Sequence, residues 1–182
     1  MQVAKVMTRP VVIVNYDPKW PKLFEKEKKL ILGTIGHITV RIEHIGSTSV
    51  PGLGAKSIID ILVAINHLCD AKKCIQSLQM IGYEYQPRHE AHIPERRYFR
   101  KGEPPREQHY HLHMVELKSG FWKRHLLFRD YLRAHPEVAQ EYQDLKKQLA
   151  MEYGLDREGY TEAKTPFIEP VVVKARAEKE DS

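Results

Sequence analysis

A row of alternating histidines is the first feature of this sequence that could do chemistry. The stretch HYHLHMVE places His109, His111 and His113 at every second position, so on a β-strand the three rings share one face. Neutral imidazole is a frequent metal ligand, and a spacing of two along a strand suits metal ligation. The row therefore predicts a metal site, and the alternative is a set of half-exposed histidines on a polar face.

Asp60 is a single acid inside the apolar run SIIDILVAI. A buried carboxylate is costly unless a cation or strong donors compensate it, and the run itself favours a buried strand inside a covered sheet. We therefore expect Asp60 to face a metal or a cationic site. Together with His111 and His113 it forms the predicted set of metal ligands and catalytic groups. The alternative is a structural ion pair between Asp60 and a basic neighbour.

A turn of small residues precedes this strand, in the stretch IGSTSVPGLGAK. Backbone N–H groups and hydroxyls in such a turn can hold phosphate oxygens. A phosphate-holding turn followed by a carboxylate on the next strand is what metal-dependent phosphoryl or nucleotidyl transfer requires. Because short Gly/Ser motifs are weak signals, a purely structural turn is the alternative. The predicted phosphate-binding residues are Gly46, Ser47, Thr48 and Lys56.

The stretch RRYFRK, residues 96–101, is the second source of positive charge. Arginine forks suit phosphate oxygens, and we expect Arg97 and Arg100 to neutralise phosphate charge. On a strand these two residues point to opposite faces, so the facing of the strand decides which one does so. Aromatic residues alternating with arginine also fit single-stranded nucleic acid, which nothing else in the sequence indicates. An exposed basic strand is the remaining alternative.

Strands and helices must position these residues. Nearly alternating β-branched residues predict a strand over residues 38–45. The apolar run over residues 57–65 predicts a buried strand, and further strands are expected over residues 82–86, 97–101 and 109–116. Helical spacing and capping residues predict helices after Asp17-Pro18, over residues 70–81 and 119–134, and after Pro136. A last helix after Thr161 is limited by Pro166 and Pro170. The order of elements predicts an α+β (α/β) fold.

The first helix carries more detailed expectations. Asp17 is a suitable N-cap and Pro18 a suitable first helical residue. The lysine-rich segment 26–29 should form a solvated face. The segment KGEPPRE, residues 101–107, should form a turn or loop. The residues expected in the core-facing stripe of the helix are Trp20, Leu23, Phe24, Leu30 and Ile31.

Composition limits the class of protein. The chain has 182 residues, of which 42% are hydrophobic and 29% charged, as in soluble globular domains. A net charge of +5 suits phosphate-bearing ligands without by itself indicating nucleic acid. Cys69 and Cys74 do not share a helical face, and two such cysteines fit a reducing compartment. With no signal peptide and no membrane-length apolar run, we expect a cytoplasmic protein without a membrane partner.

Five segments in the expected order resemble the GrpB family, from about Val12 to Val173. This family is placed within the nucleotidyltransferase superfamily, which has the DNA polymerase beta-like catalytic fold. The resemblance implies that residues 1–182 form a single nucleotidyltransferase-like domain with a central mixed β-sheet, flanking α-helices and a helical C-terminal third. The segments are HIGSTSVPGLGAKSIIDILV, RRYFRK, HYHLHMVE, LLFRDYLRAHPEVAQEYQDLKKQLA and YTEAKTPFIEPV.

The superfamily pattern assigns roles by position. A Gly-Ser turn, here Gly46 and Ser47, is followed by a strand with the pattern acid, apolar, acid. Asp60 matches the first acid, whereas the second position holds Leu62, which cannot bind metal. The strand that usually supplies a third acid resembles HYHLHMV, where His111 or His113 stands in. A single metal, a softer metal held with histidines, and nucleotide binding without catalysis are the alternatives to a two-metal site.

The resemblance therefore implies a protein that binds a nucleoside triphosphate and a divalent metal, Mg²⁺ or Mn²⁺ with Zn²⁺ as an alternative, and transfers a nucleotidyl group to an unknown acceptor. Family members also resemble a domain fused to dephospho-CoA kinase, where an accessory role in folding has been proposed. The chain has no glycine-lysine kinase loop, so no kinase activity is assigned. The alternatives are a non-catalytic accessory or interaction module and a metal-dependent phosphoesterase. The oligomeric state is open.

Overall fold

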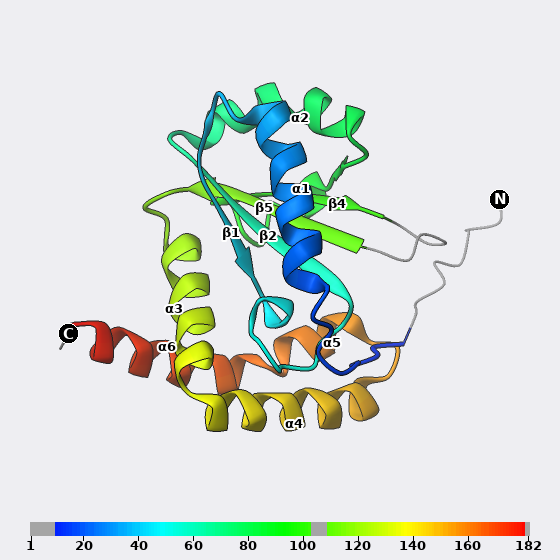
Figure 1. Ribbon diagram of the computed structural model, residues 1–182, viewed down its shortest axis with the longest axis vertical. Coiled ribbons are helices and arrows are strands. Elements are labelled where there is room, and N and C mark those ends of the chain that lie inside the picture. The colour runs from blue at the N-terminus through cyan, green and yellow to red at the C-terminus, as the bar shows by residue number, and fades with distance from the viewer. Residues whose placement is uncertain (1–9, 103–108, 181–182) are drawn as a thin grey trace.

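The computed structural model describes residues 10–102 and 109–180 and contains one mixed β-sheet with helices on both faces (Figure 1). The strands are β1 Thr39–Ile45, β2 Ile58–Ile65, β3 Glu84–Tyr85, β4 Arg96–Lys101 and β5 His109–Glu116. The α-helices are α1 Trp20–Ile35, α2 Ala71–Met80, α3 Gly120–Ala134, α4 Pro136–Tyr153, α5 Arg157–Glu162 and α6 Thr165–Glu180. The predicted α+β class and the helical C-terminal part are confirmed. Most of the loop expected over residues 101–107 and the first residues of the chain lie outside the described ranges.

The strand order is β1-β2-β5-β4-β3, and the only parallel pair among these strands is β2 with β5. The predicted strand boundaries agree with this sheet to within a residue or two. Since β2 and β5 lie inside the sheet with neighbours on both sides, both strands are paired along their full length. The residues discussed above as metal ligands all come from this parallel pair.

Alternation along β2 divides its side chains between two hydrophobic layers. Ile59 and Ile61 are fully buried in the layer formed with α1 and α2. Leu62 and Ala64 are fully buried in the opposite layer, where they pack with Phe121 and Trp122 of α3. Asp60 shares the second face by alternation. The sheet is therefore covered on both sides, as the apolar character of β2 predicted.

Helix α1 differs from its predicted form at both its start and its polar face. The helix begins at Trp20 rather than at Pro18, although the side chain of Asp17 accepts the Lys19 N–H at 2.9 Å, as an N-cap does. Leu30, expected in the core, is 42% exposed. Glu27 interrupts the predicted solvated segment, since it is 5% exposed and accepts a hydrogen bond from Lys101 Nζ at 2.6 Å. The ion pair with Lys101 of β4 thus explains why Glu27 is buried within the lysine-rich segment.

Helix α6 continues through Pro170, contrary to the expectation that this proline limits it. A proline removes one backbone hydrogen bond from a helix interior, so packing must compensate. Val171 and Ala175 provide that packing, because they are buried against Tyr131 of α3. No helix within residues 10–102 and 109–180 combines the length and the apolar character needed to cross a membrane.

The C-terminal helices pack on the connection between β1 and β2. Val50 and Leu53 of this connection are buried with Leu132 of α3 and with Ala139 and Tyr142 of α4. In Figure 1, α4 lies across the end of the sheet next to this connection. Helices that are distant in sequence are therefore placed beside the Gly46 turn and the start of β2.

Candidate metal and phosphate site

Asp60, His111 and His113 meet on one face of the β2–β5 pair. The parallel register places Asp60 opposite His111 and Leu62 opposite His113. Asp60 Oδ1 lies 3.3 Å from His111 Nδ1 and 3.6 Å from His113 Nε2. One ligand atom from each residue lies within 4.8 Å of the others. The predicted convergence of these three residues is confirmed, and their role as metal ligands stays a prediction.

Asp60 is held in its ionised form. Burial by itself raises the pKa of Asp60, but hydrogen bonds with His111 and His113 and the electrostatic effect of both rings lower it well below its ordinary value. Burial lowers the pKa of His113, which favours a neutral ring. The side chain of Asp60 is still 27% exposed, so a small cation can reach the carboxylate.

Gly46 allows the turn after β1 to touch this carboxylate. Its φ of +70° is a left-handed conformation that side chains disfavour. A Cβ atom added at Gly46 would lie 2.5 Å from Asp60 Oδ2. Glycine at this position is therefore required both by the turn and by the close approach to Asp60.

The two hydroxyls of the predicted phosphate turn differ in what they bind. Thr48 is 2% exposed, and its hydroxyl donates to Ile58 O at 3.0 Å. That hydroxyl also lies 3.0 Å from His44 Nε2, and burial lowers the pKa of His44 to about 4. Ser47 Oγ instead accepts a hydrogen bond from Lys146 Nζ at 2.9 Å. The structure thus places Thr48 inside the turn, whereas Ser47 joins the turn to α4.

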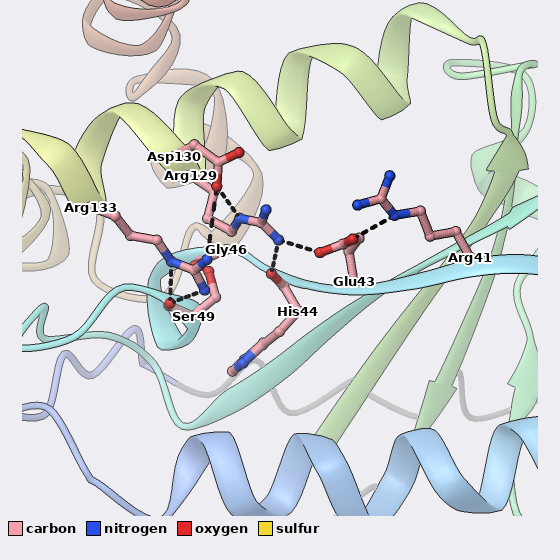
Figure 2. Close-up of polar contacts among 8 residues, drawn as sticks. All are labelled: Arg41, Glu43, His44, Gly46, Ser49, Arg129, Asp130 and Arg133. Carbon is pink, nitrogen blue, oxygen red and sulfur yellow. Dashed lines mark hydrogen bonds and ion pairs between the residues drawn. The ribbon is translucent and has the colours of Figure 1, made fainter.

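Two arginines of α3 hold the same turn from the other side (Figure 2). Arg129 Nη1 donates to Glu43 Oε2 at 2.8 Å and to His44 O at 3.0 Å. Arg133 donates to Ser49 O from Nε at 3.0 Å and from Nη2 at 2.7 Å. The sequence analysis missed both arginines, although their spacing of four on one helical face could have indicated a shared target.

The facing of β4 separates the two predicted phosphate arginines. Tyr98 lies opposite His113 and Arg100 opposite His111 in the β4–β5 register. Arg100 Nε donates to the Tyr98 hydroxyl at 3.2 Å, on the face of the site. Arg97 points to the other face, where its Nη1 donates to Pro94 O at 2.9 Å. The structure therefore places Arg100, but not Arg97, on the face of the sheet that holds Asp60, because successive residues of a strand face opposite sides.

Arg96 is a further basic residue at the site. Its Nη1 lies 3.3 Å from His113 Nδ1, and its guanidinium lies 4.8 Å from the centre of the Tyr98 ring. Arginine can only donate, so Nδ1 accepts and the proton of the neutral His113 ring lies at Nε2, toward Asp60. With a metal bound at Nε2, the proton of the neutral ring would lie on Nδ1, which could no longer accept from Arg96, so Arg96 would have to turn away. Arg96 thus competes with a cation for His113.

Comparison with known proteins identifies the family. A family model described as "GrpB protein" matches residues 10–174. The chain belongs to the GrpB family. The Glutamate-rich protein GrpB of Alkalihalophilus pseudofirmus is 38% identical over 89% of this chain and 94% of its own length. The crystal structure of conserved protein GrpB from Enterococcus faecalis is 36% identical and covers 92% of this chain and 99% of its own, with a TM-score of 0.82.

A longer GrpB relative also matches. The UPF0157 protein YqkA of Bacillus subtilis (strain 168) is 39% identical over 92% of this chain. The matched region covers 48% of YqkA, so this chain spans about half the length of that relative. The mixed α+β fold of this GrpB chain has a solved counterpart within the family, the Enterococcus faecalis structure.

The GrpB site offers a mixed donor set for one cation. Two imidazole nitrogens and one carboxylate leave coordination positions open for water or substrate, and imidazole suits zinc, iron and other transition metals better than magnesium. Leu62, at the position of a second acid, is fully buried beside Trp122. The carboxylate that would bridge a second ion is therefore missing from β2.

Proposed function

We propose that this GrpB-family chain is a nucleotidyltransferase-fold protein that binds one divalent cation and a nucleoside triphosphate, and that it transfers a nucleotidyl group to an acceptor. The observation that carries the proposal is the contact between the Gly46 turn and Asp60, beside His111 and His113. A turn, a carboxylate and cationic side chains on adjacent strands are the parts that such a transfer needs.

The residues present fit a single cation. Asp60, His111 and His113 would hold it through one oxygen and two nitrogens. The donor chemistry favours Zn²⁺ or Mn²⁺ over Mg²⁺. The bound cation would supply Lewis-acid polarisation of a phosphate oxygen. Arg100 and Lys56 would neutralise phosphate charge. Both lie near the site, because the charges of Asp60 and Arg100 act on the pKa of Lys56.

The buried Leu62 favours a second candidate function. With no second carboxylate on β2, the chain could bind nucleotide and metal without transferring a group, as an accessory or interaction module. A phosphoesterase that uses the two imidazoles is the third candidate.

The free cysteines Cys69 and Cys74 fit a reducing compartment, so we place the proposed function in the cytoplasm.

Calorimetric titration with Zn²⁺, Mn²⁺ and Mg²⁺ tests the cation site. Asp60→Asn keeps the shape of the side chain and removes its charge, so we expect metal binding to be lost. Asp144→Asn is the matched control, since Asp144 is an exposed acid of α4, and this variant should bind metal as the unchanged protein does. Equal metal affinity in the Asp60→Asn variant would contradict the proposed site.

Thermal unfolding with each of the four common nucleoside triphosphates tests nucleotide binding. A ligand at about 100 times its dissociation constant stabilises the folded state by about 2.7 kcal/mol. We expect such a stabilisation with at least one triphosphate and a larger one when Zn²⁺ or Mn²⁺ is added. Stabilisation without any transfer to water or to added acceptors supports the accessory module, and no stabilisation refutes nucleotide binding.

A further inference from the structure

Three lysines from separate parts of the chain gather beside the Gly46 turn. Lys146 Nζ of α4 donates to Ser47 Oγ at 2.9 Å. Lys56, just before β2, and Lys164, between α5 and α6, lie over the same Tyr160 ring, with Nζ at 5.2 Å and 4.7 Å from its centre. We call Lys56, Lys146 and Lys164 the lysine cluster. Neither Lys146 nor Lys164 belongs to the site predicted from the sequence.

The lysine cluster adjoins the carboxylate of Asp60. Ser47, which binds Lys146, follows directly on Gly46, the residue that approaches Asp60. Burial lowers the pKa of both Lys56 and Lys164, and the charge of Asp60 partly opposes that effect, which places these ammonium groups within electrostatic range of the carboxylate. The cluster therefore forms the side of the site that faces the C-terminal helices.

The lysine cluster has an excess of positive charge. Lys146 is 2% exposed, and burial together with the charges of Lys164, Lys56 and Lys147 lowers its pKa to about 7. Burial and the charge of Lys56 lower the pKa of Lys164 to about 8, against the opposite effect of Asp60. Two further cations, Arg157 and Arg100, act on Lys56.

Repulsion of this kind is relieved by a polyvalent anion. The carboxylate of Asp60 opposes the cluster through its effects on Lys56 and Lys164. A bound anion would raise the pKa of Lys146 and of Lys164 again and so restore their full charge. A monophosphate carries about 1.5 to 2 negative charges at neutral pH, fewer than three charged lysines. Two linked phosphates carry more charge and more acceptor oxygens, so they match three ammonium groups from three segments better.

We propose that the lysine cluster and Ser47 form a pocket for a diphosphate group, either the terminal two phosphates of a nucleoside triphosphate or an inorganic polyphosphate. The proposal deepens the proposed function, since diphosphate is the leaving group of nucleotidyl transfer. In that step the acceptor oxygen bonds to the α-phosphorus, and the bond from this phosphorus to the diphosphate oxygen breaks. The electron pair leaves with the diphosphate, whose charge the lysines stabilise, and the proton of the acceptor passes to water.

Titration calorimetry with pyrophosphate, tripolyphosphate and orthophosphate tests the pocket on the full chain, with a chelator present to remove metal. We expect pyrophosphate and tripolyphosphate to bind more tightly than orthophosphate. Lys164→Met and Lys56→Met should each weaken pyrophosphate binding by about tenfold or more, since a charged hydrogen bond is lost. Lys118→Met, an equal charge change in the exposed turn after β5, is the matched control and should change affinity less than about twofold.

Circular dichroism of each variant confirms that it is folded, and a nucleoside triphosphate titrated beside tripolyphosphate separates the two sources of the ligand. Tighter binding of the nucleotide assigns the pocket to a nucleotide, and equal binding assigns it to any polyphosphate. The absence of pyrophosphate binding, or equal loss in the Lys118→Met and Lys164→Met variants, would overturn the pocket. Pyrophosphate binding in the metal-free protein, together with no transfer activity after Zn²⁺ or Mn²⁺ is restored, would uphold the pocket and refute only the transferase.

Discussion

At the scale of single residues, the partly buried carboxylate of Asp60 is compensated by the imidazoles of His111 and His113. The observed partners of Asp60 are His111 and His113, so the basic neighbours of the structural alternative are histidines rather than an arginine. Imidazoles are neutral or cationic near neutral pH, so they can compensate a carboxylate and still exchange it for a metal ion. An arginine in the same place would be a permanent cation and would oppose metal binding.

Gly46 gives a sharp test of the turn at Asp60. We expect Gly46→Ala to destabilise the fold by about 2–4 kcal/mol, because it adds left-handed backbone strain and a contact with Asp60. Gly52→Ala is the matched control, since Gly52 has a φ of +79° and no atom within 4 Å of an added Cβ. It should cost only the backbone strain, about 1–2 kcal/mol. Urea unfolding measures both values, and equal losses would show that the Asp60 contact has no energetic effect.

Arg96 gives a test of competition at His113. Arg96→Met removes a cation and frees His113 Nδ1, so we expect metal affinity to rise by about tenfold, the equivalent of one charged hydrogen bond. Arg97→Met makes the same change on the opposite face of β4 and should leave metal affinity unchanged. Titration of both variants with Zn²⁺ measures the effect, and unchanged or weaker binding in Arg96→Met would refute the competition.

At the scale of elements, two arginines of α3 form hydrogen bonds with the end of β1 and with the turn that follows it. Arg129 pairs with Glu43 at 2.8 Å, with side-chain exposures of 9% and 19%, and it also holds the backbone of His44. Arg133 binds Ser49 O but is 39% exposed. The site-forming turn therefore depends on a helix that lies far away in sequence.

We expect Arg129→Met to destabilise the fold by about 2 kcal/mol, because the mostly buried Glu43 then keeps only the exposed Arg41 as its partner and His44 O loses its donor. Arg133→Met, on the same face of α3, should cost about 1 kcal/mol, since its partner is a carbonyl and its side chain is more exposed. A double-mutant cycle of Arg129→Met with Glu43→Gln should show coupling above about 1 kcal/mol by urea unfolding. Additive losses would show that the ion pair does not hold the turn.

At the scale of the whole molecule, the C-terminal helices complete the site by packing on the β1–β2 connection. Lys146 joins them to the turn, since its Nζ donates to Ser47 Oγ at 2.9 Å and also to Gly54 O. The cost of this arrangement is a buried cation whose pKa is lowered to about 7 by burial and by the charges of neighbouring lysines. That cost makes stability depend on pH.

The sign of the dependence follows from linkage. An unfolded lysine titrates at about 10.4, so between about pH 7 and pH 10 the unfolded state binds more protons than the folded state at Lys146. The free energy of unfolding contributed by Lys146 therefore rises with pH in this range. We expect Lys146→Met to have a smaller rise than the unchanged protein in urea unfolding from pH 6 to pH 9. Lys118→Met, in the exposed turn after β5, is the control, and equal slopes in all three proteins would contradict the assignment.

The sequence by itself determined the features that depend on neighbours along the chain. Strand alternation predicted that His111 and His113 share a face, and the apolar run around Asp60 predicted a covered strand. The helix predicted over residues 119–134 is capped by Ser119, whose hydroxyl accepts the Trp122 N–H at 3.2 Å. These features follow from backbone periodicity and local hydrogen bonds, which a few residues are enough to specify.

Only the tertiary structure decided which distant residues meet. The parallel register of β2 and β5 placed Asp60 opposite His111, and the facing of β4 selected Arg100 rather than Arg97. Packing of α4 on the β1–β2 connection brought Lys146 to Ser47. Register and helix placement are set by the free energy of burying apolar surface summed over the whole domain, rather than by any local pattern. Since the site is made of side chains from five separate segments, its composition depended on that sum.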